Sequence, residues 1–329
     1  MLKQMNRFLA VDRIEFIVTY RCNSHCKHCQ IRQDKRVSRP AAIDEGLAVQ
    51  IIRGVVQAYS PRSVMTFGGE PLLFPDLVCA IHEAARANGV GSREVITNVG
   101  WPRSETEFRA VAFKLADSGV NDICISVDCF HQEYIPLSIV EQNVQCLIDA
   151  RVGRLRWNPC WVVSKEHDNS WNRRTKSILR ALAHLPVAES DGNVVQPMGN
   201  ALVWLRDFMP SRIPIPPGSC GDMPYTGRLD KVSSISVEPD GSIAVCDEFV
   251  IGNAIQRDIV EMLRSYDPYR IPEMRAILEG GIAGLAALAC TKGVETDPSG
   301  YYSICDMCKS IRRRLAKFGA SATSRWEDQ

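Results

Sequence analysis

The sequence has almost no net charge and no evident targeting segment. Its 39 Lys and Arg residues stand against 38 Asp and Glu residues, which gives a formal net charge of +1. This balance argues against a protein that a basic field holds on nucleic acid or on an acidic membrane surface. No apolar stretch comes near the length of about 18 residues that a membrane span needs, and the start lacks the pattern of a signal peptide. We therefore expect a cytoplasmic protein with no nucleic-acid partner and no membrane partner.

Cysteine, in contrast, is abundant. The chain has 13 cysteines, an odd number, and nothing in the sequence suggests export to an oxidising compartment. In a reducing compartment, clustered cysteines bind metals or carry out redox chemistry more often than they form disulfides. The cysteine positions are therefore the first indication of function.

Short β-branched runs alternate with segments of helical periodicity up to about residue 200. Ser104 with Glu107, and Ser138 with Glu141, have the spacing of a helix-capping box. Strand–helix units of about 30 residues are typical of parallel sheets covered by helices. Six units are too few for a closed eight-stranded barrel, so we expect an α/β fold, a partial parallel (β/α)6 barrel. Its strands are expected at 14–19, 63–67, 93–97, 122–127, 155–163 and 193–197.

The pattern changes after Trp204. A proline-rich connector at 210–218 is stiff and non-helical, and we place a domain boundary there, between 1–205 and 206–329. Beyond the connector, strands at 233–238 and 242–246 flank a Pro-Asp-Gly turn, which predicts a hairpin. Helical patterns at 259–266, 272–278 and 308–318 complete a small C-terminal α+β domain.

Three thiols lie within eight residues directly after the first expected strand, at Cys22, Cys26 and Cys29. Zinc sites usually pair cysteines as C-x2-C and close with four ligands. Three unequally spaced thiolates suit an iron–sulfur cubane better, because they can hold three irons and leave the fourth open. A zinc knuckle or a chance cluster is the alternative.

Further polar motifs fall at the ends of the next expected strands. Gly68-Gly69-Glu70-Pro71 ends the second strand; its glycines would let the backbone approach a ligand, and its carboxylate could accept bonds from an ammonium group. Asn98 follows the third strand, and Ser126 and Asp128 end the fourth. The carboxyl ends of parallel strands share one rim, where ligands bind in α/β folds. The sequence therefore predicts one site on this rim.

The C-x3-C-x2-C loop, with His28 just before its last cysteine, and the GGEP motif together resemble the radical S-adenosylmethionine (radical SAM) superfamily. The resemblance covers 14–205 in architecture. It implies a 4Fe-4S cluster on Cys22, Cys26 and Cys29, whose open iron chelates S-adenosylmethionine. Reductive cleavage of that cofactor would then yield a 5'-deoxyadenosyl radical.

The resemblance also implies a set of cofactor-binding residues. Glu70 would meet the ammonium group of the cofactor, within the motif Gly68, Gly69, Glu70 and Pro71. Single polar residues at the other strand ends would help to hold its carboxylate, ribose or adenine, namely Asn98, Ser126, Asp128 and Gly199. Asn200 stands where relatives commonly have an arginine, which weakens the match at that turn.

A second cysteine set, Cys220, Cys246, Cys305 and Cys308, lies beyond the connector. Its C-x2-C pair begins a helix, a position that favours thiolates. The set resembles the shortened SPASM module called a twitch domain, which implies a second, auxiliary 4Fe-4S cluster. Cys290 could replace Cys220 as a ligand, and structural zinc is the alternative metal.

Three further residues near the rim are candidates for catalysis: Cys129, Cys160 and His131. A thiol there could donate a hydrogen atom to a substrate radical, as in some epimerising relatives, and the histidine could contact or protonate the substrate. Buried packing is the simpler role for both thiols, and an exposed loop position is the simpler role for the histidine.

The resemblance implies a radical SAM oxidoreductase or maturase that abstracts hydrogen from a substrate carbon. We expect a ribosomal peptide as substrate, modified by oxidation, cross-linking or epimerisation, and a small sugar or cyclitol is the alternative. A flavodoxin-type or ferredoxin-type donor would supply the electron, and a separate leader-peptide-binding protein could recognise the peptide. A hypothesis from another class is a non-catalytic iron–sulfur carrier or scaffold.

Overall fold

The computed structural model describes residues 6–31, 40–101, 104–222, 227–246 and 249–323. One eight-stranded sheet organises the chain, in the order β10-β9-β8-β1-β2-β3-β4-β5. Strands β8 to β5 pair in parallel, whereas β9 and β10 join antiparallel at one edge. The prediction of an α/β fold is therefore confirmed, with a mostly parallel central sheet. The strand bounds are β1 Leu9–Thr19, β2 Ser63–Gly68, β3 Ser92–Thr97, β4 Asp122–Ile125, β5 Arg154–Trp157, β8 Val232–Val237, β9 Ser242–Cys246 and β10 Phe249–Asn253.

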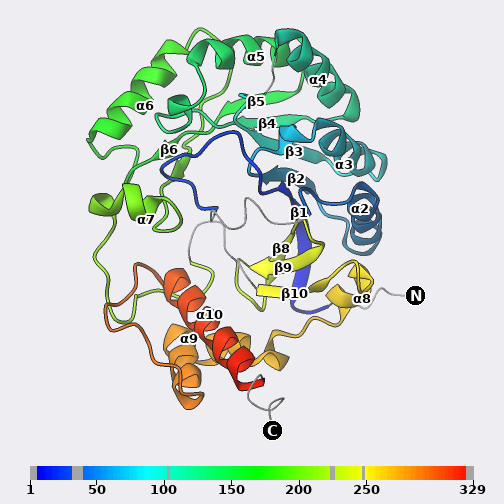
Figure 1. Cartoon of the computed structure of the whole chain (residues 1–329). Helices are drawn as coiled ribbons and strands as arrows, with labels where there is room; N and C mark the ends of the chain where they lie inside the picture. The colour runs from blue at the N-terminus through cyan, green and yellow to red at the C-terminus, as the bar shows by residue number, and fades with distance from the viewer. Residues whose placement is uncertain (1–5, 32–39, 102–103, 223–226, 247–248, 324–329) are drawn as a thin grey trace.

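A row of helices covers one face of this sheet (Figure 1). The strand residues on that face are apolar and fully buried, for example Ile14, Phe16 and Ile123. Each such side chain stabilises the fold by about 1.5–3 kcal/mol when it leaves water. The helices are α2 (Glu45–Tyr59), α3 (Pro75–Ala87), α4 (Glu105–Ser118), α5 (Leu137–Asp149) and α6 (Ser170–Ala181).

The opposite face of the sheet carries charges near the amino ends of the strands. The strand register places Glu15, Met65, Glu94, Asp122 and Arg154 in one row from β1 to β5. Arg156 on β5 meets Glu94 at 3.0 Å and Asp122 at 2.9 Å. These paired charges tie three strands together at the end of the sheet opposite the predicted site.

The two predicted capping boxes have different outcomes. Ser104 caps α4, because its hydroxyl accepts from the Glu107 N–H at 3.2 Å, and this prediction is confirmed. The second prediction was wrong. Helix α5 begins at Leu137 with Pro136 as its N-cap and has no side-chain cap, since Ser138 already lies inside the first turn.

The strand expected at 155–163 is two strands. β5 ends at Trp157, and β6 (Cys160–Trp161) pairs with β7 (Asn193–Val194) in a separate two-stranded sheet. Pro159 lies between β5 and β6, and a proline has no N–H to give to a strand ladder. The strand expected at 193–197 is correspondingly short, and the one expected at 122–127 ends at Ile125. Helix α7 (Ala201–Trp204) follows β7.

The hairpin predicted beyond the connector is confirmed as β8 and β9, with Gly241 in the left-handed region at φ 81°. The sequence did not reveal that β8 would pair in parallel with β1, nor that β10 would extend the sheet. The main sheet therefore continues across the boundary drawn between 1–205 and 206–329, and the two-domain division stays a prediction. Helices α8 (Ile259–Arg264), α9 (Pro272–Thr291) and α10 (Ile304–Thr323) complete the chain.

Helix α9 corrects the statement that no stretch is long and apolar enough for a membrane span. Among the described residues it is the one helix that meets that criterion by length and composition. Such a match is weak evidence, because core helices of soluble proteins pass the same test. Gly281, at φ 62° and ψ −157°, interrupts the helix, and Met274 and Leu285 are buried against the core.

Candidate metal centre

The cysteine loop lies at the carboxyl end of β1 and is fastened to the turn after β2. The N–H of Gly69 donates to the Thr19 carbonyl at 2.7 Å, and the N–H of Glu70 donates to the Arg21 carbonyl at 2.9 Å. A Cβ atom on Gly69 would lie 2.0 Å from the Arg21 oxygen, and one on Gly68 would lie 2.3 Å from the Thr19 oxygen. Both glycines are therefore required by the close approach of the cysteine loop, a reason different from the ligand approach that the sequence suggested.

Glu70 is fully buried and connects the ends of β2 and β3. Its carboxylate accepts from the Thr97 hydroxyl at 2.7 Å, from the Asn98 N–H at 2.8 Å and from the Leu72 N–H at 3.0 Å. Burial raises the pKa of Glu70 to about 7, and these three donors oppose the rise. Pro71 is also buried and begins the short 3-10 turn Pro71–Leu73. Contact between Glu70 and an ammonium group stays a prediction.

The three cysteines of the loop form no disulfide, with Cys26 only 5% exposed and Cys22 and Cys29 half-buried. Two elements distant in sequence hold the loop. The Asn98 side-chain amide donates to the Asn23 side chain at 2.8 Å and lies 3.9 Å from the Cys22 sulfur. On the other side, Asn200 donates its N–H to the Cys29 carbonyl and its side-chain amide to the Cys26 carbonyl, both at 2.9 Å.

Gly199 lies against the same loop. A Cβ atom there would be 2.3 Å from the Cys29 oxygen, and its φ is 57°. The turn after β7 therefore supports the cysteine loop, and its predicted contact with a cofactor stays a prediction. Asn200, which the sequence marked as a departure from the arginine of relatives, is a support for two cysteine carbonyls.

A buried Asp–His pair lies beside the loop. Asp128 accepts from the Phe130 N–H, the His131 N–H and the Cys160 N–H at 2.9–3.0 Å, and its second oxygen is 2.9 Å from His131 Nδ1. Burial alone would raise the pKa of Asp128, but the His131 charge and hydrogen bond hold it well below its usual range. Burial alone would lower the pKa of His131, and Asp128 reverses that shift and raises it.

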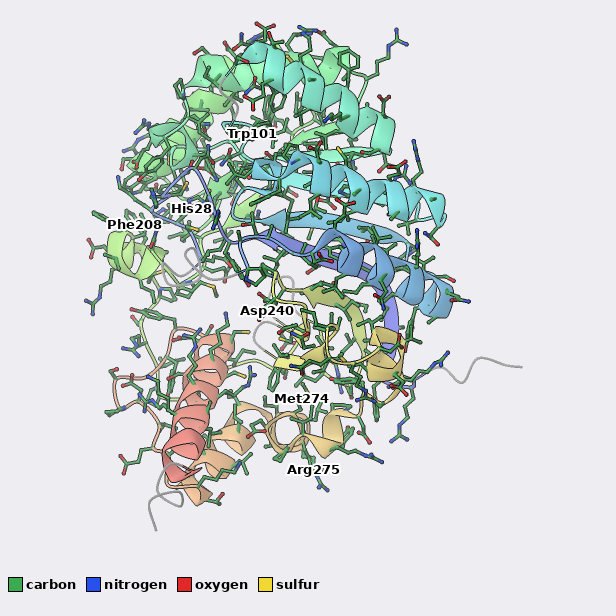
Figure 2. The ribbon with its side chains drawn as sticks, turned by 45° about the vertical axis from the view of Figure 1, so that its right-hand side comes forward. His28, Trp101, Phe208, Asp240, Met274 and Arg275 are labelled. Atoms are coloured by element: carbon green, nitrogen blue, oxygen red, sulfur yellow. The ribbon has the colours of Figure 1, made fainter. Side chains whose placement is uncertain are left out.

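His28 completes this group. Its ring lies 5.0 Å from the His131 ring and 4.8 Å from the Phe130 ring, and burial lowers its pKa to about 4. Ligand atoms of His28, Asp128 and His131 lie within 4.8 Å of one another. A metal ion on this trio is disfavoured, because four hydrogen bonds already occupy the Asp128 oxygens. Figure 2 shows His28 on the loop after β1, on the same side of the molecule as Phe208.

The two candidate thiols are placed close to the cysteine loop. Cys129 and Cys160 belong to one apolar cluster with Cys26 and Phe130. Burial raises the pKa of Cys129 to about 12 and that of Cys160 well above its ordinary value. Both are therefore protonated thiols at neutral pH. Ser126 lies half-buried after β4, and its N–H donates to the Thr97 carbonyl at 2.8 Å.

The structure also brings to the loop residues that the sequence did not single out. Lys27, between two loop cysteines, pairs with Glu133 at 2.8 Å. Its ammonium lies 5.0 Å from the centre of the Trp171 ring and 5.9 Å from that of Trp204. A lysine inside a cysteine motif was the available signal, but its partners come from three other elements and could not be read from the spacing.

In the second cysteine set, Cys246 ends β9 and Cys305 and Cys308 lie at the start of α10; α10 is in the lower part of the molecule (Figure 1). Burial, followed by the nearby Cys305, raises the pKa of Cys220. Burial raises the pKa of Cys308 to about 12, with Cys220 and Cys305 contributing and Arg312 opposing. Burial raises the pKa of Tyr266, and the nearby Cys246 and Cys220 add to the rise. These interactions relate Cys220, Cys305 and Cys308 to one another and Cys246 to Tyr266, whereas Cys290 is exposed on α9. Cys220 as a ligand, with Cys290 as its alternative, stays a prediction.

Comparison with known proteins agrees with the fold. Residues 16–151, which carry the cysteine loop and the GGEP motif, match the radical SAM superfamily. No curated protein matches the chain. Native anSMEcpe with bound AdoMet is similar in structure, with a TM-score of 0.53 and 13% identity over 96% of this chain and 99% of that chain.

Two further solved structures match the chain. The anSMEcpe structure with bound AdoMet and Cp18Cys peptide gives a TM-score of 0.51 and 13% identity, over 96% of this chain and 99% of that one. BtrN in complex with AdoMet and 2-DOIA gives 0.46 and 15%, over 83% and 89%. At these identities, the two anSMEcpe structures show a shared α/β fold with a mostly parallel central sheet, and nothing finer.

Proposed function

We propose that this chain is an enzyme that acts on S-adenosylmethionine. Its residues 16–151 match the radical SAM superfamily. A radical SAM domain implies a 4Fe-4S cluster and this cofactor, which together supply a 5'-deoxyadenosyl radical that abstracts hydrogen from carbon. The central sheet would form the partial (β/α)6 barrel around them.

One observation carries the proposal. Three cysteines lie on a single loop, and that loop is packed so closely against Gly68 and Gly69 that no side chain fits between them. A zinc knuckle has no need of this fixed position at the carboxyl rim of a parallel sheet, where α/β enzymes bind ligands. The donor set also fits the cluster, since thiolates are the usual ligands of iron–sulfur clusters.

The chain's own residues have distinct tasks in this proposal. Cys22, Cys26 and Cys29 would hold the cluster. Glu70 fixes the ends of β2 and β3, so that the rim keeps its shape when ligands bind. His28 Nδ1 is buried and has no hydrogen-bond partner among the described residues. Such an atom suits a site that a polar ligand completes, since buried polar groups are usually paired.

Asp128 and His131 would handle a proton. The Asp128 carboxylate accepts from His131 Nδ1, which fixes the ring orientation and leaves Nε2 as the nitrogen that can exchange a proton with a substrate. The protonated thiols of Cys129 and Cys160 lie in the same apolar cluster and could each supply a hydrogen atom. The apolar surroundings would also exclude water from the reacting groups.

The second cysteine set would hold an auxiliary 4Fe-4S cluster in a twitch-type module. Such a module would favour net oxidation of the substrate, because a second cluster could accept an electron from a substrate radical. We propose a ribosomal peptide as the substrate, with a leader-peptide-binding protein as a further partner, since such modules most often accompany peptide modification. A small sugar or cyclitol is the outcome to be expected if no peptide is accepted.

Turnover of S-adenosylmethionine tests the proposal. Anaerobically reconstituted, reduced protein should form 5'-deoxyadenosine, and the Cys22→Ala/Cys26→Ala/Cys29→Ala variant should form none. Cys290→Ala, which removes an exposed thiol outside both sets, is the matched control and should retain full activity. Cys305→Ala/Cys308→Ala should remove about half of roughly eight irons and keep part of the cleavage. Iron without 5'-deoxyadenosine would favour a non-catalytic carrier, and zinc in the second set would contradict the auxiliary cluster.

A further inference from the structure

We infer that Asn143 of α5 is a positioning residue for the first cysteine loop, and that it acts by holding the strained turn at 97–100 after β3. The inference deepens the proposed function and rests on it, because this loop would carry the cluster on Cys22, Cys26 and Cys29. The proposed function alone gives no task to a residue of α5.

The turn contains a valine in a conformation that valine rarely adopts. Val99 has a φ of 49°, and in this left-handed region Cβ comes close to the following carbonyl oxygen, so the surroundings must impose the conformation. Among the described residues, the other non-glycine residues with positive φ are exposed, namely Ser60, Arg151 and Val163, whereas Val99 is fully buried. Backbone strain of this kind clusters at functional sites.

Asn143 is an unusual residue for its place on α5. It is 1% exposed and shares the buried face of the helix with Val140, Val144 and Leu147, where an apolar side chain would bury no polar atom. Its amide nitrogen donates to the Val99 carbonyl at 2.7 Å, and its Oδ1 has no hydrogen-bond partner among the described residues. The buried amide and the strained valine each break a local rule, and they meet in one hydrogen bond.

The turn presents Asn98 to the cysteine loop. The Gly100 N–H donates to the Asn98 side-chain oxygen at 2.9 Å, which leaves the amide nitrogen to face the loop. That nitrogen donates to the Asn23 side chain at 2.8 Å and lies 3.9 Å from the Cys22 sulfur. If Val99 relaxed to a negative φ, the peptide group after it would rotate and the Gly100 N–H would leave the Asn98 oxygen.

The first half of the turn is held independently of α5. Glu70 accepts from the Thr97 hydroxyl at 2.7 Å and from the Asn98 N–H at 2.8 Å, and the Thr97 hydroxyl accepts from the Val99 N–H at 3.0 Å. The second half of the turn begins at the Val99 carbonyl, which is the atom that Asn143 holds. Loss of the Asn143 amide should therefore move the Asn98 side chain while the end of β3 stays in place.

The variant Asn143→Leu tests this inference, because leucine keeps the volume, suits the apolar face of α5 and lacks the amide donor. In metal-free protein, amide hydrogen exchange in the cysteine loop should accelerate by about fivefold, with little change in β3. In metal-loaded protein, the electron paramagnetic resonance signal of the first cluster should broaden or shift. Asn143→Ala should have the same effects. Val144→Ala, on the same buried face but without a hydrogen bond to the turn, is the matched control and should leave loop exchange and signal unchanged.

A glycine at position 99 gives a second, opposite test. Glycine adopts positive φ without strain, so the turn no longer needs a partner to keep it in that region. Asn143→Leu/Val99→Gly should therefore bring loop exchange back to within about twofold of the original protein and restore the cluster signal. Val99→Gly alone should lower stability, because a buried side chain is lost, and should keep the signal.

Two results would overturn the inference. One is loop exchange in Asn143→Leu equal to that in Val144→Ala, and the other is a double variant no better than Asn143→Leu. Exchange in metal-free protein measures the positioning of the loop without any cofactor. If the original protein formed no 5'-deoxyadenosine while the exchange results held, the proposed function alone would be contradicted.

Discussion

The two cysteine sets are built in opposite ways. The first is contiguous, and its backbone is fastened on two sides, by the glycines after β2 and by Asn200 before α7. The second consists of four cysteines from the segment after the connector, a hairpin strand and the start of α10, with Cys220 and Cys308 88 residues apart (308 − 220). The first loop keeps its place through hydrogen bonds within the chain, whereas the second set would depend far more on the proposed metal to join its segments.

This structural difference fits the different tasks that the proposed function gives to the two sites. A site that must present an open position to a cofactor benefits from ligands that the protein itself orients. A site closed by four thiolates can draw part of its folding free energy from the metal, as small metal-binding modules do. Tyr20, just before the first cysteine, donates its hydroxyl to Glu238 in the hairpin that leads to Cys246, and so connects the two regions.

Removal of metal should have the largest effect and should be confined to one region. We expect amide exchange in β9 and at the start of α10 to accelerate by at least about tenfold on metal removal, because four thiolates lose their common partner. Exchange in β1 and β2 should change much less. Hydrogen–deuterium exchange with mass spectrometry on metal-loaded and metal-free protein measures both, and equal acceleration in the two regions would refute the comparison.

Substitution of Gly69 should disrupt the first site even with metal present. In Gly69→Ala, the added Cβ would meet the Arg21 carbonyl at 2.0 Å, so the cysteine loop must move away from the rim. We expect a loss of about 2–4 kcal/mol in the free energy of unfolding and loss of the electron paramagnetic resonance signal of the first cluster. Gly280→Ala is the control, because nothing lies within 4 Å of a Cβ there. A normal cluster signal in Gly69→Ala would show that the loop needs no such support.

The sequence predicted most of what is local. The first cysteine loop, the Ser104 cap and the hairpin around Gly241 depend on neighbours a few residues away, and each was found from spacing. What the sequence missed depends on distant partners. The pairing of β8 with β1 joins segments more than 200 residues apart, and Ser138 fails as a cap because Pro136 begins the helix earlier.

The same distinction holds for the candidate site. Glu70 was predicted on the rim and lies there, but the three donors that hold it come from the 3-10 turn and from β3. Asp128 was predicted as a ligand-binding carboxylate, and its oxygens accept mainly from backbone N–H groups and His131. A residue type shows which hydrogen bonds and proton transfers a side chain can make. Tertiary packing decides which neighbours it makes them with.

A pH titration should show how strongly burial of the Glu70 carboxylate lowers the free energy of unfolding. The pKa of Glu70 is about 7 in the fold against a usual 4.5, so the folded protein binds a proton that the unfolded chain has released between these values. Stability is therefore full below pH 4.5 and falls as the pH rises through 7, by about 1.4 kcal/mol per pH unit for one group. In metal-free protein, Glu70→Gln should reduce this slope, with His131, whose pKa is also raised, accounting for the remainder.

Chemical denaturation from pH 5 to 8 measures that slope. Glu45→Gln, at an exposed carboxyl on α2, is the control and should leave the slope unchanged. At pH 5, Glu70→Gln should lower stability by about 1–3 kcal/mol, because an amide nitrogen cannot accept from the Asn98 N–H. This difference should shrink as the pH rises, because the glutamine has no charge to bury. An unchanged slope would mean that Glu70 stays ionised throughout and that its three donors outweigh burial.

The smallest effect should come from loss of the Asn200 side chain, which holds the first cysteine loop from the side of α7. Asn200→Ala removes the side-chain hydrogen bond to the Cys26 carbonyl but keeps the backbone bond to Cys29, so we expect a loss of about 1 kcal/mol. Asn88→Ala removes an equivalent amide-to-carbonyl bond at the end of α3 and should cost a similar amount. The two should differ in the first cluster: broadened or shifted resonance lines are expected for Asn200→Ala alone, because only its partner carbonyl belongs to a cluster ligand. Identical spectra would mean that the glycines alone position the loop, and that the turn before α7 contributes stability without shaping the site.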